Sequence, residues 1–119
     1  MPKTLPVIDM TSPVCCAPVA AAPVDAETAL AIALRLKAIA DPVRVRLLSI
    51  LLSDPDGEHN SGGLAAAVGL GESTVSHHLT QLRKAGLIAS ERRGMHTVHA
   101  ARREALSALC VALDPNCCR

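Results

Sequence analysis

Residues 69–86 read Gly-Leu-Gly-Glu-Ser-Thr-Val-Ser-His-His-Leu-Thr-Gln-Leu-Arg-Lys-Ala-Gly, and they are the most informative part of this chain. The first glycines form a tight turn that leads into a short amphipathic helix from about residue 72 to residue 84. Val75, Leu79 and Leu82 recur at helical spacing and face the core. Gly86 ends the helix, since glycine accepts the left-handed conformation needed there. The outer face suits base edges and phosphates of DNA better than chemistry on a small substrate.

A β-hairpin is predicted directly after this helix. The runs 87–91 and 95–100 are β-like and surround Arg92-Arg93-Gly94, so the hairpin has a cationic tip. A short buried helix at 64–68 precedes the glycine turn. Two short helices joined by such a turn and followed by a hairpin form a winged helix-turn-helix. The expected fold class is mainly α with a small β-hairpin, with about five helices plus the wing.

The candidate DNA contacts divide by their chemistry. Arginine and lysine bind phosphates, which gives salt-dependent affinity, whereas hydroxyls and the Gln81 amide can read bases. The alternative to DNA binding is a solvent-exposed surface helix whose cations contact no ligand. The predicted contacts are Ser73, Thr74, Ser76, His77, Thr80, Gln81, Arg83, Lys84, Arg92 and Arg93.

The histidines are poor candidates for a joint metal site. His77 and His78 are consecutive and do not share one helix face. His77 is interpreted as a contact to DNA or its backbone, and a plain exposed or partly packed histidine is the alternative. His96 and His99 fall on opposite faces of a regular strand.

The chain divides into three segments. Residues 1–24 hold five prolines and one cysteine pair and are expected to form an extended or mobile arm. Residues 25–113 form the winged domain, in which Asp25 caps the first helix and Asp41-Pro42 starts a helix over 43–53. The stretch 60–63 is expected to be polar and flexible.

The end of the chain is expected to be one helix and a short tail. The last helix covers 103–113, with Leu106, Leu109, Cys110 and Leu113 facing inward. Residues 114–119 follow as a cysteine-containing tail.

Composition narrows the class of protein. The chain has 119 residues, half of them apolar and none aromatic, so one domain with a small core is expected to lean on a partner subunit. The net charge is +1, but residues 72–103 hold six Lys and Arg against two Asp and Glu.

No apolar stretch is long enough to span a membrane and no secretion signal is evident, which predicts a cytoplasmic protein. Its five cysteines would then be mostly reduced thiols.

Three stretches resemble the ArsR/SmtB family of metal-sensing repressors. Residues 37–48 resemble its Ala-Asp-Pro-x-Arg opening, 73–82 its recognition helix and 85–88 its entry to the wing. The resemblance implies a cytosolic homodimer, built through the first and last helices, on a palindromic double-stranded operator. It also implies release from DNA when a metal or metalloid binds.

The family's usual metal ligands are missing from this sequence. The stretch 58–64 has no thiol where many arsenic and lead sensors carry Cys-x-Cys, and the last helix has no histidine for the zinc-sensing pattern. Val98 and His99 stand where the family usually has a wing tyrosine.

Cysteines at both ends of the chain remain as candidate ligands. Some actinobacterial arsenic repressors are similar in carrying an N-terminal Cys-Cys pair that a thiol of the partner subunit completes. Thiolates select soft ions, so trivalent arsenic or antimony is favoured, with cadmium, lead, zinc and copper(I) as alternatives. Core packing is the favoured interpretation of the fifth cysteine, on the last helix. The candidate ligands are Cys15, Cys16, Cys117, Cys118 and, last, Cys110.

The sequence therefore predicts a DNA-binding repressor released by a thiophilic ion. One alternative is the same regulator with a thiol-redox or other non-metal trigger, and another is a thiol carrier of arsenic or copper(I) that does not bind DNA. An enzyme is not expected, because the sequence shows no paired carboxylates in a plausible pocket and no nucleophile–base pattern.

Overall fold

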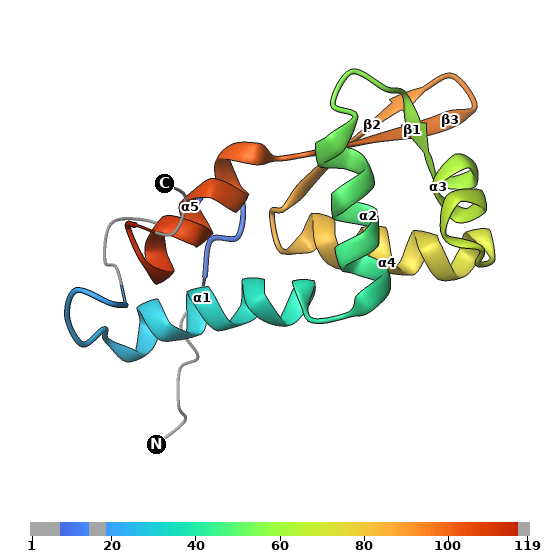
Figure 1. Cartoon of the computed structure of the whole chain (residues 1–119). Coiled ribbons are helices and arrows are strands. Elements are labelled where there is room, and N and C mark those ends of the chain that lie inside the picture. The colour runs from blue at the N-terminus through green and yellow to red at the C-terminus, as the bar shows by residue number, and fades with distance from the viewer. Residues whose placement is uncertain (1–7, 15–18, 117–119) are drawn as a thin grey trace.

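The computed structural model describes residues 8–14 and 19–116 (Figure 1). Within them the chain forms five helices and three short strands, which confirms the mainly α fold class with a small β-wing. None of the described helices is long and apolar enough to span a membrane. In chain order the elements are α1 (Ala26–Ile39), α2 (Pro42–Ser53), β1 (His59–Asn60), α3 (Ser61–Val68), α4 (Glu72–Lys84), β2 (Ile88–Arg93), β3 (His96–Ala101) and α5 (Arg103–Leu113).

Aspartate side chains start the first two helices, as predicted. Asp25 Oδ1 accepts a hydrogen bond from the Thr28 N–H at 2.8 Å at the start of α1. Asp41 Oδ1 accepts from the N–H groups of residues 43 and 44, at 2.8 and 3.2 Å. Pro42 is the first residue of α2, the position predicted for it, and the helix ends at Ser53 as expected.

The stretch 60–63 is ordered, and the prediction of a flexible segment is wrong. Asn60 ends strand β1, and its side chain accepts a hydrogen bond from the Gly63 N–H at 2.8 Å, which starts α3 at Ser61. Strand β1 pairs with β3 through His59 opposite His99. Two glycines weaken the helical signal here, and the partner strand is nearly 40 residues away, so sequence pattern alone gave little indication of either element.

The three strands form one antiparallel sheet in the order β1-β3-β2. Arg93 pairs with His96, which leaves Gly94 and Met95 as a two-residue turn in which Gly94 has φ +61°. The predicted tip Arg92-Arg93-Gly94 is therefore corrected, because both arginines belong to the end of β2.

The core has two parts. The larger one lies between α2, α3, α4 and the sheet, where Leu47, Val75, Leu82 and Leu87 are fully buried. The smaller one joins α1 to α5, which lie side by side away from the wing (Figure 1). Leu109 faces inward on α5 as predicted.

The inward-facing stripe of α5 is narrower than expected. Leu106 and Cys110 are only half-buried, and Leu113 is 36% exposed. The described part of the chain is one subunit, so a side chain that would be buried by a partner is exposed here.

Candidate nucleic-acid interface

Helix α4 presents a polar face to solvent, as its sequence predicts. Val75, Leu79 and Leu82 are buried and fix the rotation of the helix against the core. Of the predicted contacts on α4, five are exposed and three are half-buried. The exposed ones are Ser73, Thr74, His77, Arg83 and Lys84, and the half-buried ones are Ser76, Thr80 and Gln81. The Thr80 hydroxyl donates to the Ser76 carbonyl at 2.9 Å, so it is already engaged within the helix.

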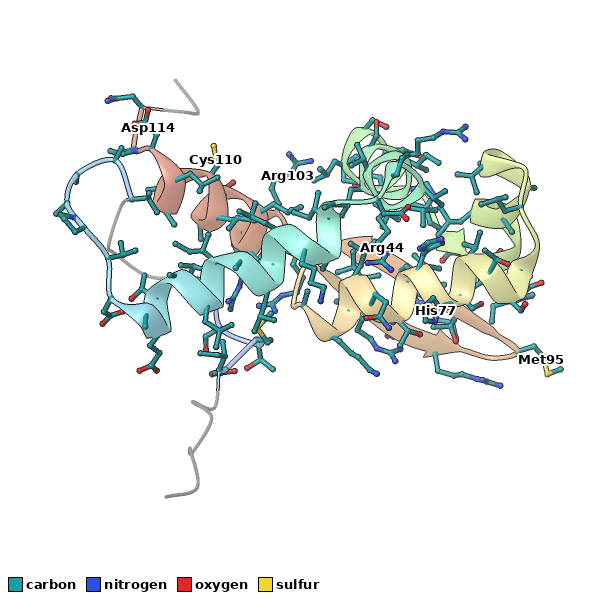
Figure 2. All side chains as sticks on the ribbon, turned by 90° about the horizontal axis from the view of Figure 1, so that it is seen from below. Arg44, His77, Met95, Arg103, Cys110 and Asp114 are labelled. Carbon is teal, nitrogen blue, oxygen red and sulfur yellow. The ribbon has the colours of Figure 1, made fainter. Side chains whose placement is uncertain are left out.

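The two consecutive histidines of α4 have different environments. His77 is exposed on the outer face, where Figure 2 shows it on the side of α4 away from the core. His78 is half-buried, and its Nδ1 accepts a hydrogen bond from Arg44 Nε at 3.0 Å. Arg44 Nη1 also donates to the Ala38 carbonyl at 3.3 Å, which holds the guanidinium between α1, α2 and α4. Sequence reasoning missed this contact because its partners are 34 residues apart.

The two wing arginines differ in their partners. Arg93 Nη1 lies 2.6 Å from Glu58 Oε1, and its Nη2 lies 3.4 Å from Glu91 Oε2. Arg92 Nε donates to the Gly94 carbonyl at 3.2 Å, and no carboxylate of the described residues pairs with it. Met95, at the tip, is 87% exposed (Figure 2). The positive charge of the wing is therefore most available at Arg92.

His99 is a buried structural residue. Its ring nitrogens hydrogen-bond to the hydroxyls of Ser61, at 3.0 Å, and Ser90, at 2.7 Å. Burial lowers the pKa of His99, and the nearby Arg83 lowers it further. His96 is exposed on the opposite face, as the strand alternation predicts. Among the described residues, no three His, Cys, Asp or Glu side chains form a group that could hold a metal ion.

The described part of the N-terminal arm has no helix or strand, but it is packed against the domain. Arg35 of α1 is almost fully buried, and its Nη2 donates to the carbonyls of Asp9, at 3.1 Å, and Ser12, at 2.8 Å. Hydrogen bonds from Thr11 and Ser12 to the Asp9 carboxylate tighten this turn and lower the pKa of Asp9 to about 2. The signal for Arg35 was present in the sequence, because it falls on the buried stripe of α1 beside Ile32 and Ala38.

The same arm segment also contacts the end of the recognition helix. Arg102 Nη1 donates to the carbonyls of Thr11, at 2.8 Å, and Gly86, at 3.2 Å. Gly86 has φ +73°, as its role at the end of α4 predicts, and the Met10 carbonyl lies where a Cβ would stand. We call residues 9–12, held by Arg35 and Arg102, the arm clip.

The candidate thiols lie at the other end of the arm and on α5. Cys15, Cys16, Cys117 and Cys118 fall outside the described residues. On either side of the first pair, Val14 packs against the α1–α5 cluster and the Val19 N–H donates to the Ala112 carbonyl at 2.7 Å.

Cys110 on α5 does not match the expectation of a free or deeply packed thiol. It is half-buried and disulfide-bonded.

Comparison with known proteins identifies the family. A profile described as "Bacterial regulatory protein, arsR family" matches residues 41–90, which include α2, α3 and α4. A solved structure is described as a possible transcriptional regulator for arsenical resistance. It is 32% identical to this chain with a TM-score of 0.57, and the match covers 63% of this chain and 75% of that protein's chain. The chain belongs to the ArsR family. This confirms the resemblance found at residues 37–48, 73–82 and 85–88.

Two further regulators are similar to this chain, one in sequence and one in structure. The regulator NmtR of Mycobacterium tuberculosis is 37% identical over 78 residues, covering 66% of this chain and 62% of NmtR. The chain thus spans less than two thirds of the length of NmtR, and 52% of that of the related regulator CmtR. The homodimeric winged helix-turn-helix DNA-binding domain of Mb0332 from Mycobacterium bovis is 26% identical, with a TM-score of 0.61, covering 76% of this chain and 84% of its own. The relatives are transcriptional regulators and not enzymes.

Proposed function

We propose that this chain is a DNA-binding transcriptional repressor that acts as a homodimer in the cytoplasm on a palindromic operator. The observation that carries this proposal is the outer face of α4, where His77, Arg83 and Lys84 are exposed beside the hydroxyls of Ser73 and Thr74. A helix of this length and polarity fits the major groove, and Arg92 lies on the wing that follows it. A two-fold dimer places two such helices on two half-sites.

Exposed apolar side chains support a dimer built through α1 and α5. Leu36 of α1 is 39% exposed, and Val111 and Leu113 of α5 are 45% and 36% exposed. These two helices pack against each other in one subunit, so their outward apolar faces form neighbouring surfaces. Burying them against a second copy removes apolar area from water, which is the main driving force for association.

The proposed inducer is a thiophilic ion, with arsenite or antimonite favoured over cadmium, lead, zinc or copper(I). The chain has five cysteines, which supply thiolates once the Cys110 disulfide is reduced, and arsenite requires only three thiolates and no particular charge. On either side of Cys15-Cys16, Val14 packs against the α1–α5 cluster and Val19 hydrogen-bonds to α5, the helix that carries Cys110. The disulfide at Cys110 supports a gathering of sulfur atoms here, since it requires a second sulfur within bonding distance. The likeness to a possible regulator for arsenical resistance also favours a metalloid.

The arm clip provides a physical connection between these thiols and the DNA-binding face. Cys15 lies three residues beyond Ser12, whose carbonyl binds Arg35, and Met10 rests on Gly86 at the end of α4. When thiolates bind an ion, the arm is pulled toward the ligand site. The clip then shifts against Gly86 and Arg102, and the spacing of the two recognition helices changes. Release is as complete as the ion's preference for the DNA-free state allows.

Replacing the four terminal cysteines with serine tests the sensing step. The variant C15S/C16S/C117S/C118S should bind the operator like the unmodified chain and should no longer be released by arsenite. A gel-shift or anisotropy titration on the chain's own upstream DNA, challenged with arsenite, antimonite, cadmium, zinc and peroxide, measures both properties. Unchanged release by arsenite in this variant would contradict metalloid sensing by these thiols.

A thiol-redox trigger is the second candidate, and the Cys110 disulfide favours it. Release of DNA by peroxide, together with no release by arsenite, would identify this trigger. A thiol carrier that does not bind DNA would instead show no operator binding in the same titration, and its ion binding would not depend on Gln81, Arg92 or Arg93.

A further inference from the structure

A basic groove lies beside the recognition helix. This hollow of about 590 Å³ opens between α1, the start of α2 and the outer face of α4. Lys37 lines it from α1, Arg44 from α2, and His77, Gln81 and Lys84 from α4. Figure 2 shows Arg44 and His77 on neighbouring helices at this side of the molecule. Two cations from outside the helix-turn-helix and wing therefore border the surface that is proposed to enter DNA.

The groove is positive and has no acidic lining residue. In the described part of the chain, none of Lys37, Arg44 and Lys84 forms a salt bridge, whereas Arg93 and Arg102 both do. Two hydrogen bonds, to His78 Nδ1 and to the Ala38 carbonyl, already hold the Arg44 guanidinium in place. A fixed cation loses little side-chain entropy when an anion binds, so the groove is preorganised for a negative ligand.

The position of the groove identifies that ligand. An α-helix with its side chains is about 10–12 Å across, and the major groove is about 12 Å wide. A helix seated in the major groove therefore has a sugar–phosphate backbone running along each side. The hollow along α4 is where one of these backbones must pass when His77 and Gln81 face the base edges.

We propose that this groove binds the DNA backbone, with Lys37 and Arg44 as phosphate contacts in addition to α4 and the wing. The inference rests on the proposed DNA-binding function and extends its contact surface to α1 and α2. Lys37 neutralises one phosphate per subunit in this arrangement. It contributes affinity that depends on salt and not on sequence.

Lys37→Gln is the decisive variant, because Lys37 is exposed and its side chain forms no hydrogen bond with the described residues. Anisotropy titrations of full-length protein on its upstream operator, from 50 to 300 mM salt, give the slope of log K against log salt concentration. Loss of one phosphate contact in each subunit of a dimer should reduce the magnitude of this slope by about 1.8. The corresponding loss of operator affinity at 0.15 M salt is roughly 30-fold. Binding to an unrelated duplex should weaken by a similar factor.

Arg103→Gln is the matched control. It removes the same charge from α5, where Arg103 Nη2 donates to the Leu52 carbonyl, away from the groove residues Arg44 and His77 (Figure 2). Its salt slope should equal that of the unmodified chain. A Lys37→Gln slope that matches the Arg103→Gln slope would overturn the groove proposal while leaving DNA binding intact. Absence of operator binding by the unmodified chain would instead overturn the proposed function, and with it this inference.

Discussion

The glycine at the end of α4 offers a sharp test of how the arm is seated. Gly86 and Gly69 both have left-handed backbones, with φ +73° and +71°. A Cβ at position 86 would overlap the Met10 carbonyl oxygen and lie 3.1 Å from the Met10 carbonyl carbon, whereas a Cβ at position 69 would meet nothing within 4 Å. Gly86→Ala and Gly69→Ala thus share the same backbone strain, and only the first displaces the arm.

The expected difference follows from the contacts of the arm clip. The strain of an alanine in the left-handed region is about 1 kcal/mol in both variants. Displacing the arm removes three hydrogen bonds from arginines, each about 1.5 kcal/mol, and the partial burial of Met10, about 1.5 kcal/mol. The freed backbone of residues 9–12 regains about 1 kcal/mol of entropy per residue. The net additional loss for Gly86→Ala is therefore about 2 kcal/mol.

Urea unfolding of the full-length variants, at one fixed protein concentration, measures this difference. We expect a loss of about 1 kcal/mol for Gly69→Ala and about 3 kcal/mol for Gly86→Ala. The same Gly86→Ala protein should also show a smaller effect of arsenite on operator affinity, because the arm no longer touches the end of α4. Equal destabilisation of the two variants, within about 0.5 kcal/mol, would refute the arm clip.

Three further predictions concern single side chains. Burial holds the pKa of His99 below its ordinary value of 6.5, so the unfolded chain binds the proton more readily than the folded one. The free energy of unfolding should therefore fall as the pH drops below about 6.5. His99→Asn should flatten that part of a curve of stability against pH. Asp41→Ala should cost about 1 kcal/mol in urea unfolding and Asp41→Asn much less, since asparagine also caps a helix. Arg92→Gln should reduce the salt slope of operator binding more than Arg93→Gln, because Glu58 already neutralises much of the Arg93 charge; equal slopes would contradict this.

Local chemistry made the recognition helix predictable. Val75, Leu79 and Leu82 repeat at helical spacing, Gly86 stops the helix, and Asp41 with Pro42 starts another. Each of these signals acts within a few residues of the chain, so the sequence carries it in full. The outward face of α4 follows from the inward one, which is why exposed residues such as His77 were placed correctly.

Contacts between distant segments had no comparable local signal. The arm clip holds residues 9–12 against Arg35 and Arg102, and the basic groove is lined by both Lys37 and Lys84. A short polar stretch such as 9–12 has no periodicity, so only the packed domain shows where it lies. The same holds for Arg93, whose neutralisation depends on Glu58, 35 residues away.

The amino-acid sequence alone determined the helix-turn-helix, the wing and the buried stripe of α4, because hydrophobic periodicity and capping are properties of neighbouring residues. The family came from the resemblance of its motifs to those of known repressors. Only the tertiary structure decided which cations stay unpaired, which histidine is buried, and how the arm reaches the recognition helix. Those features depend on distances between groups far apart in the chain, and such distances exist only once the core has formed.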